Sequence, residues 1–180
     1  MPRSSTMEYT FTLKYQLADD DRDPDALVER LGEVGCDDAL VGIGQPGRLA
    51  LEFTREADSA DAAVRSALAD VRSAVPSARL IEVAPDLVGL TDVADIVGVS
   101  RQNMRKLMLA HPGSFPAPVH EGSASIWHLA DVLAWLQAKG SYSLAMDVLE
   151  VACVALQVNV VKEGRRLSRS ASDELEALVE

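Results

Sequence analysis

The order in which strand and helix patterns follow one another is the feature that most constrains how the first 85 residues fold. Apolar and polar residues alternate from Tyr9 to Leu17, and this period of two is typical of a half-buried strand. Asp23 followed by Pro24 predicts the start of a helix, and Gly35 predicts its end. The patterns that follow predict strands over 39–43 and 49–53, a helix over 58–75 and a strand over 78–83.

The predicted order of strand, helix, strand, strand, helix, strand places the chain in the α+β class. With right-handed crossovers it gives a four-stranded antiparallel sheet with two helices on one face, the ferredoxin-like βαββαβ architecture. We therefore expect a ferredoxin-like domain over 7–85 that acts as a sensor or an interaction domain. Because many unrelated domains share this architecture, the sequence leaves open whether it binds a small ligand or a protein partner.

A glycine motif in the middle of this domain imitates a nucleotide-binding fingerprint. Residues 42–47 read Gly-Ile-Gly-Gln-Pro-Gly, which matches G-x-G-x-x-G. A dinucleotide site requires these glycines to open a helix whose free N–H groups meet the pyrophosphate. Here a strand pattern follows instead, and Pro46 lacks an N–H group. The motif is therefore interpreted as a hairpin turn, and no cofactor is expected.

The chain is acidic overall, and its basic residues are unevenly distributed. Its net charge of −11 argues against a nonspecific coat for nucleic acid or membrane. Residues 1–85 carry 9 basic against 16 acidic side chains, whereas residues 86–140 carry 4 against 5. Three of those four, Arg101, Arg105 and Lys106, lie within six positions. A DNA reader whose cations are concentrated in one place is therefore compatible with the composition.

The segment from Leu90 to Met108 predicts a helix-turn-helix. Thr91 is expected to cap a first short helix, Gly98 permits a sharp left-handed turn, and Ser100 is expected to cap a second helix. Arginine pairs with guanine, and Asn or Gln with adenine, in the major groove, and the first turn of such a helix makes these contacts. The alternative is a surface helix that is only polar and basic. The outer face of the second helix consists of Arg101, Gln102, Asn103, Arg105 and Lys106.

The next segment predicts a hairpin and a closing helix. Residues 115–120 are interpreted as an extended strand, residues 121–124 as a turn and residues 125–128 as the returning strand. Helical spacing resumes over 129–136, and Asp131 is expected near the N-terminal cap. This order places a protruding hairpin directly after the helix-turn-helix.

Several features of this region match a known family of DNA-binding proteins. They are Val93-Ala94, Gly98-Val99-Ser100, Phe115-Pro116-Ala117-Pro118-Val119, Trp127, Asp131-Val132 and Trp135-Leu136. In these features, residues 88–137 resemble the winged helix-turn-helix of the AlpA and excisionase group, which is related to the MerR type. The resemblance covers under a third of the chain. The combination of a turn, a proline-flanked wing and a Trp-Leu helix is more specific than any one feature.

The resemblance implies a winged helix-turn-helix DNA-binding domain over 88–138, with double-stranded DNA as the partner. In this family the second helix enters the major groove and the wing approaches phosphates or the minor groove. One residue departs from the pattern, because wings in this family commonly carry a basic residue at the tip and this chain has Glu121. The residues implied to contact DNA are Ser100, Arg101, Gln102, Asn103, Arg105 and Lys106 on the helix, and His120 and Ser123 in the wing.

The leading hypothesis is a sequence-specific DNA-binding transcriptional regulator that reads the major groove with the helix starting at Ser100. The alternative is an antitoxin or adaptor whose acidic N-terminal domain binds a basic protein partner. The aspartate-rich run at residues 19–25 and the acidic wing favour this alternative. Because one copy carries few cations and so neutralises few phosphates, tight DNA binding is expected of a dimer.

Residues 141–162 predict a helix that is apolar over most of its circumference, so it must be buried against another surface. Two alternatives are open: packing on its own chain, or a two-fold interface with a second copy. MerR-type regulators place a pairing helix after the DNA-binding domain, which favours a homodimer through residues 142–161. The tail over 163–180 starts basic and ends acidic, and is expected to be loosely ordered or to bind a partner.

No motif predicts catalysis or metal binding. The sequence contains no G-x-S-x-G, phosphate-binding loop or H-E-x-x-H, and its three histidines, at 111, 120 and 128, lack metal-ligand spacing. We therefore expect neither an enzyme nor a metal site. Cys36 and Cys153 both lie in segments with a buried pattern, which favours reduced thiols and a cytoplasmic location. No apolar run approaches the roughly 20 residues of a membrane helix, and the first residues lack the apolar core of a secretory signal.

Overall fold

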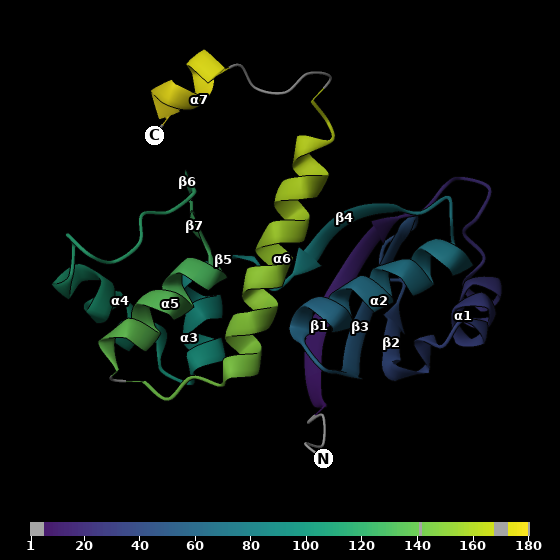
Figure 1. The fold of residues 1–180 in the computed structure, drawn as a ribbon, viewed down its shortest axis with the longest axis horizontal. Helices are drawn as coiled ribbons and strands as arrows, with labels where there is room; N and C mark the ends of the chain where they lie inside the picture. The colour runs from purple at the N-terminus through teal and green to yellow at the C-terminus, as the bar shows by residue number, and fades with distance from the viewer. Residues whose placement is uncertain (1–5, 141, 168–172, 180) are drawn as a thin grey trace.

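The computed structural model describes residues 6–140, 142–167 and 173–179. It is a mixed α+β structure with antiparallel sheets, which confirms the predicted class. The chain forms two lobes, and a long helix, α6 (Met146–Gly164), stands between them (Figure 1).

The first lobe is a four-stranded sheet covered on one face by helices. Its elements are β1 (Met7–Gln16), α1 (Pro24–Glu33), the 3₁₀ turn η1 (Cys36–Asp38), β2 (Ala39–Gly42), β3 (Arg48–Ala57), α2 (Ala60–Ala74) and β4 (Arg79–Ala84). The strands lie in the order β2-β3-β1-β4, and every neighbouring pair is antiparallel. Phe11 and Leu13 of β1 are buried, and Phe11 stacks on Phe53 of β3 with ring centroids 5.3 Å apart. The apolar half of the β1 alternation therefore faces α1 and α2.

Local capping determines where the helices of this lobe begin. The side chain of Asp23 accepts a hydrogen bond from the N–H of Asp25 at 3.2 Å, as the Asp-Pro pair predicts. Ser59 caps α2 by accepting from the N–H of Ala62 at 3.0 Å, so this helix begins two residues later than predicted. Gly47 adopts a φ of 78° immediately before β3. The glycine motif is therefore a loop between two strands, as predicted.

A buried arginine joins the sheet to α2 and η1. Arg55 is 9% exposed and donates hydrogen bonds to Asp38 and Asp70, each at 2.8 Å. The hydrogen bond that Arg55 donates to Asp38, followed by the one it donates to Asp70, raises the pKa of this guanidinium above its usual range. Burial raises the pKa of the nearby Cys36 thiol, so Cys36 is an unreactive core residue.

The second lobe contains a small sheet and three helices. Its elements are β5 (Leu87–Val88), α3 (Leu90–Val97), α4 (Arg101–Ala110), β6 (His120–Glu121), β7 (Ser125–His128) and α5 (Leu129–Lys139). The strands lie in the order β5-β7-β6. Met104, Leu129 and Leu133 are almost fully buried in a core separate from that of the first lobe. Trp127 joins this core from β7 and is 5% exposed.

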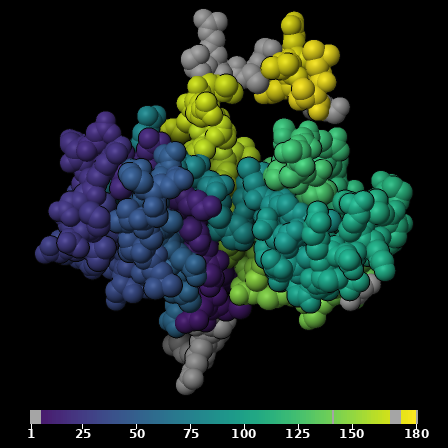
Figure 2. All heavy atoms as spheres, turned by 180° about the vertical axis from the view of Figure 1, so that it is seen from behind, coloured from purple at the N-terminus to yellow at the C-terminus, as the bar shows by residue number. Residues whose placement is uncertain are grey.

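The helix α6 belongs to both cores. Val151, Val154 and Ala155 pack in the core of the first lobe, whereas Ala152 is fully buried in the core of the second. The space-filling view from behind shows the two lobes on either side of this helix (Figure 2). Most of the apolar face that was expected to pair with a second copy is therefore covered by the chain itself, while Met146, Cys153 and Val160 of that face are exposed. Since packing on its own chain accounts for this burial, the expected homodimer through residues 142–161 has no support in the structure.

A buried aspartate ties the end of β4 to α6 and to the second lobe. Asp86 is 1% exposed, and its Oδ1 lies 2.6 Å from Nδ1 of His128. Asn159 on α6 donates to Oδ2 of Asp86 at 2.8 Å. Asn159 also pairs with the backbone of Val83, whose N–H donates to Oδ1 and whose carbonyl accepts from Nδ2, both at 2.8 Å. This polar cluster fixes the position of the chain where it leaves the first lobe.

The C-terminal region differs from expectation in three respects. The helix α6 begins at Met146 rather than near residue 142, and Cys153 is exposed rather than buried, because it points away from both cores. A short helix, α7 (Asp173–Val179), forms in the predicted tail. Residues 168–172 of that tail and the first five residues, where no secretory signal was expected, lie outside the described residues.

Among the helices that the structure describes, none is both long and apolar enough to cross a membrane.

Candidate nucleic-acid interface

The two helices α3 and α4 are joined by a tight turn over residues 98–100. Gly98 adopts a φ of 83°, which lets its N–H and that of Val99 both donate to the carbonyl of Ala94, at 2.8 and 3.0 Å. Ser100 then caps α4 by accepting from the N–H of Asn103 at 3.1 Å, as predicted.

The cap of α3 differs from the prediction. Gly89, not Thr91, occupies the N-cap position, and its N–H donates to the side chain of Asp92 at 3.0 Å. Leu90 is therefore already helical. The first helix starts two residues earlier than predicted, but the turn and the start of α4 are unaffected.

The helix α4 has one buried side and one solvent-facing side. Met104 is fully buried, and Leu107 and Met108 are half-buried against the second core. Every residue expected to read DNA from this helix is exposed. At ten residues, α4 is about 15 Å long, and a helix of this diameter fits the major groove of B-DNA. The exposed set comprises Ser100, Arg101, Gln102, Asn103, Arg105 and Lys106.

The basic residues of α4 are not neutralised within the described part of the chain. No described Asp or Glu forms an ion pair with Arg101, Arg105 or Lys106. By contrast, Arg55 pairs with two carboxylates, and Arg65 pairs with one on its own helix. No acidic residue lies in the first turn of α4, so the positive end of its dipole is also uncompensated. An anion approaching α4 therefore meets net positive charge on a chain that is acidic as a whole.

The hairpin after α4 is shorter than predicted. Only residues 120–121 form the first strand, β6, because Pro116 and Pro118 lack the N–H groups that a ladder requires. His120 pairs with Ile126 and Glu121 with Ser125.

The tip of this wing, residues 122–124, is exposed, and so are both wing residues expected to contact DNA, His120 and Ser123. A Cβ atom at Gly122 would lie 2.7 Å from Nε2 of His120, so the imidazole folds closely over this glycine. Glu121 is also exposed beside the tip, where it places a negative charge.

Three aromatic residues hold the wing against α5. The ring of Phe115 meets those of Trp127 and Trp135 edge-on, with centroids 6.0 and 5.1 Å apart. The indole N–H of Trp127 donates to the carbonyl of Pro116 at 2.9 Å, and that of Trp135 donates to Ser114 Oγ at 3.2 Å. The proline-rich segment without regular structure is thus fixed by indole hydrogen bonds. The sequence pattern included these aromatic residues among the features of the resemblance, but it did not predict their hydrogen bonds to the segment before the wing.

The three histidines are separated by the fold. His128 faces Asp86, and His111 packs edge-on against Trp135 near Lys139. His120 alone stands in the exposed wing. Within the described residues, no group of three His, Cys, Asp or Glu side chains is placed to hold a metal ion.

Comparisons with protein-family models, with curated proteins and with solved structures found no match to this chain. The arrangement of α3, α4 and the wing is therefore the basis for assigning a class of protein. This arrangement places a solvent-facing helix with unpaired cations beside an exposed hairpin.

Proposed function

We propose that this chain is a sequence-specific DNA-binding transcriptional regulator that reads the major groove with α4. The observation that carries the proposal is the outer face of α4, where Arg101, Arg105 and Lys106 are exposed and no described carboxylate pairs with them. Gln102 and Asn103 stand beside them in the first turn, which is the part of such a helix that reaches base edges. The face thus combines charge for the phosphates with amides that distinguish bases.

The proposal extends to the finer fold of both lobes. The strand order β2-β3-β1-β4, with helices on one face, supports a ferredoxin-like sensor or interaction domain in the first lobe. The tight turn between α3 and α4, the hairpin of β6 and β7 and the closing helix α5 support a winged helix-turn-helix of the AlpA type.

The antitoxin or adaptor alternative rests on the aspartate-rich run at residues 19–25, and some of these residues have partners within the chain. Asp19 pairs with Arg22, and Asp21 pairs with Arg30. Asp23 is engaged as the cap of α1. Three aspartates of this run therefore have partners within the first lobe, while Asp19, Asp20, Asp23 and Asp25 remain exposed to a partner.

The replacement of Arg101 or Arg105 by alanine tests this function. If each side chain contacts a base, each single change should weaken binding to the specific site by about 1–3 kcal/mol. We would measure binding by fluorescence anisotropy on the DNA upstream of the chain's own gene, with random competitor DNA and at two salt concentrations. Both residues are exposed, so the free energy of unfolding should be unchanged.

Arg48→Ala is the matched control, because Arg48 is an exposed arginine of the first lobe whose hydrogen bond goes to Gln16. It should bind DNA like the unmodified chain. Equal losses on specific and random DNA would identify Arg101 and Arg105 as phosphate contacts and contradict base reading. Unchanged affinity in the double variant would remove α4 from the interface.

Glu121→Lys is expected to strengthen DNA binding. The change replaces a repelled carboxylate at the wing with an amine that meets a phosphate, so affinity should rise several-fold in low salt. The slope of log affinity against log salt should steepen by about 0.9. Glu33→Lys makes the same charge change at an exposed position in the first lobe and serves as the control. If both variants gain equally, the effect reflects net charge, and the wing does not touch DNA.

A further inference from the structure

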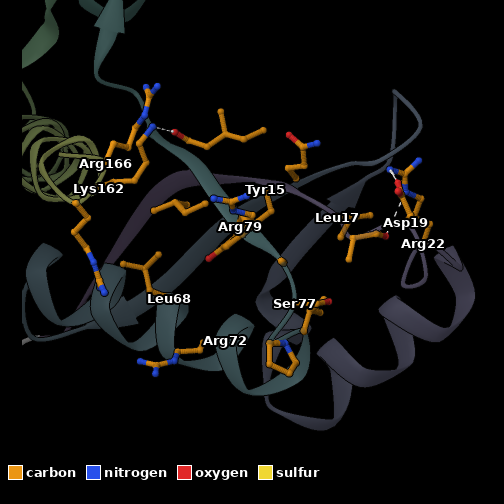
Figure 3. Close-up of a pocket in the computed structure, with 18 of the residues that line it drawn as sticks. Tyr15, Leu17, Asp19, Arg22, Leu68, Arg72, Ser77, Arg79, Lys162 and Arg166 are labelled. Carbon is orange, nitrogen blue, oxygen red and sulfur yellow. Dashed lines mark hydrogen bonds and ion pairs between the residues drawn. The ribbon is translucent and has the colours of Figure 1, made fainter. Parts of the chain in front are cut away.

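A basic groove lies in the first lobe, on the other side of α6 from α4. It runs between α2, β4 and the end of α6 towards the loop after β1, and has a volume of about 1280 Å³ (Figure 3). Six basic and two acidic side chains line it, which reverses the charge balance of the whole chain. The basic side chains are Arg22, Arg72, Arg79, Lys162, Arg165 and Arg166, and the acidic ones are Asp19 and Glu163.

Both acidic side chains of the groove are engaged by neighbouring cations. Glu163 accepts from Lys162 at 2.6 Å and from Arg166 at 3.1 Å, and these contacts lower the pKa of its carboxyl. Asp19 accepts from Arg22 at 2.5 Å. Neither carboxylate is therefore available to neutralise the other cations of the groove.

Three arginines in the groove have no such partner. Arg72 comes from α2, Arg79 begins β4, and Arg165 follows the last residue of α6. All three are exposed, and no carboxylate of the described residues lies within ion-pair distance of them. Figure 3 shows Arg79 between Arg72 on one side and Arg166 on the other. Arg72, Arg79 and Arg165 thus line one hollow from three separate elements.

The floor of the groove is apolar, and one of its sides is closed by the end of α6. Leu68 and Leu80 are half-buried there, and Tyr15 is buried beneath them. Ile81 of β4 has no partner residue in β1, because the register shifts between Lys14 and Tyr15. Instead, the carbonyl of Ile81 accepts a hydrogen bond from Nζ of Lys162 at 2.6 Å. This contact holds the end of α6 over the edge strand and closes one side of the groove.

We propose that this groove binds a small molecule that carries at least two carboxylate or phosphate groups. Forked guanidinium groups recognise both kinds of anion through paired, charge-assisted hydrogen bonds. The apolar floor accommodates the carbon body that joins the anionic groups. The groove exceeds the roughly 300–1000 Å³ of a typical ligand pocket, so the ligand fills only the part that the three arginines surround. This site goes beyond the DNA-binding function and does not depend on it.

The test is calorimetric titration of the full chain with citrate and with pyrophosphate, in separate arms, at 150 mM salt to screen nonspecific attraction. We expect saturable binding of at least one probe, and the stronger arm distinguishes a carboxylate from a phosphate ligand. Arg79→Gln and Arg165→Gln should each reduce the affinity about tenfold or more, since each removes charge-assisted hydrogen bonds. Arg65→Gln is the matched control, because Arg65 lies on α2 outside the groove with its side chain 74% exposed.

The outcomes separate a built site from general electrostatics. Loss of binding in the groove variants with retention in Arg65→Gln supports the proposal, provided that circular dichroism shows all variants folded. No binding of either probe, or equal weakening in Arg65→Gln, overturns it. Lower affinity for DNA in the groove variants without any anion binding also overturns it and makes the groove part of a DNA footprint. Failure of α4 to bind DNA leaves the calorimetric result unaffected.

Discussion

Ala152→Asp is expected to destabilise the chain by more than about 4 kcal/mol, because it places a carboxylate in the fully buried contact between α6 and the second lobe. Ala152 packs among apolar side chains of that core, which cannot compensate the charge. Urea unfolding followed by far-ultraviolet circular dichroism would measure the change. A shift of the whole unfolding transition is expected, because α6 also completes the core of the first lobe.

Cys153→Asp is the matched control for this experiment. It makes the same acidic substitution one position later on the same helix, but at an exposed site. A loss below about 1 kcal/mol is expected for it. If Ala152→Asp were equally mild, α6 would not be packed on its own chain in solution. A pairing surface for a second copy would then return as the explanation for its apolar sequence, and sedimentation equilibrium would measure that association.

Trp127→Ala is expected to cost about 3–5 kcal/mol, the range found when a large aromatic side chain is removed from a core. The indole is 5% exposed, packs edge-on against Phe115 and donates to the carbonyl of Pro116. Its loss leaves a cavity and releases the segment that leads into the wing. Chemical unfolding gives the stability, and DNA binding at a temperature where the variant remains folded gives the effect on the wing.

Trp127→Phe separates packing from hydrogen bonding. Phenylalanine retains most of the apolar area but lacks the N–H that reaches Pro116, so a loss of about 1–2 kcal/mol is expected. If the phenylalanine and alanine variants were equally unstable, the hydrogen bond rather than the packing would dominate. If neither lost stability, the closing aromatic cluster would have no part in holding the wing.

Local chemistry made several elements predictable from the sequence. The strand β1 was predictable because only one face of the sheet is covered, so its apolar and polar residues alternate. Ser100 was predictable as a helix cap because its partner, the N–H of Asn103, is only three residues away. The candidate reading face on α4 was visible for the same reason, since its cations are adjacent in the chain.

Features that depend on distant residues could not be predicted in this way. The apolar circumference of α6 required burial, but it did not identify the covering surface, which the structure shows to be both lobes. The strand expected before the wing was overestimated because apolar composition outweighed the missing N–H groups of Pro116 and Pro118. The basic groove gave no local signal, because Arg72, Arg79 and Arg165 come from three elements and Arg165 lies far along the chain from the other two.

The shared position of α6 also constrains how the chain matures during its synthesis. Domains usually fold as units, with the N-terminal one folding first while the ribosome is still translating the rest. Here each lobe needs residues of one helix that follows both lobes in the chain: Val151 and Ala155 for the first, Ala152 for the second. The nascent chain therefore exposes two incomplete apolar surfaces until that helix emerges from the exit tunnel. Because both cores include residues of α6, a chain cut before that helix would leave both of them incomplete.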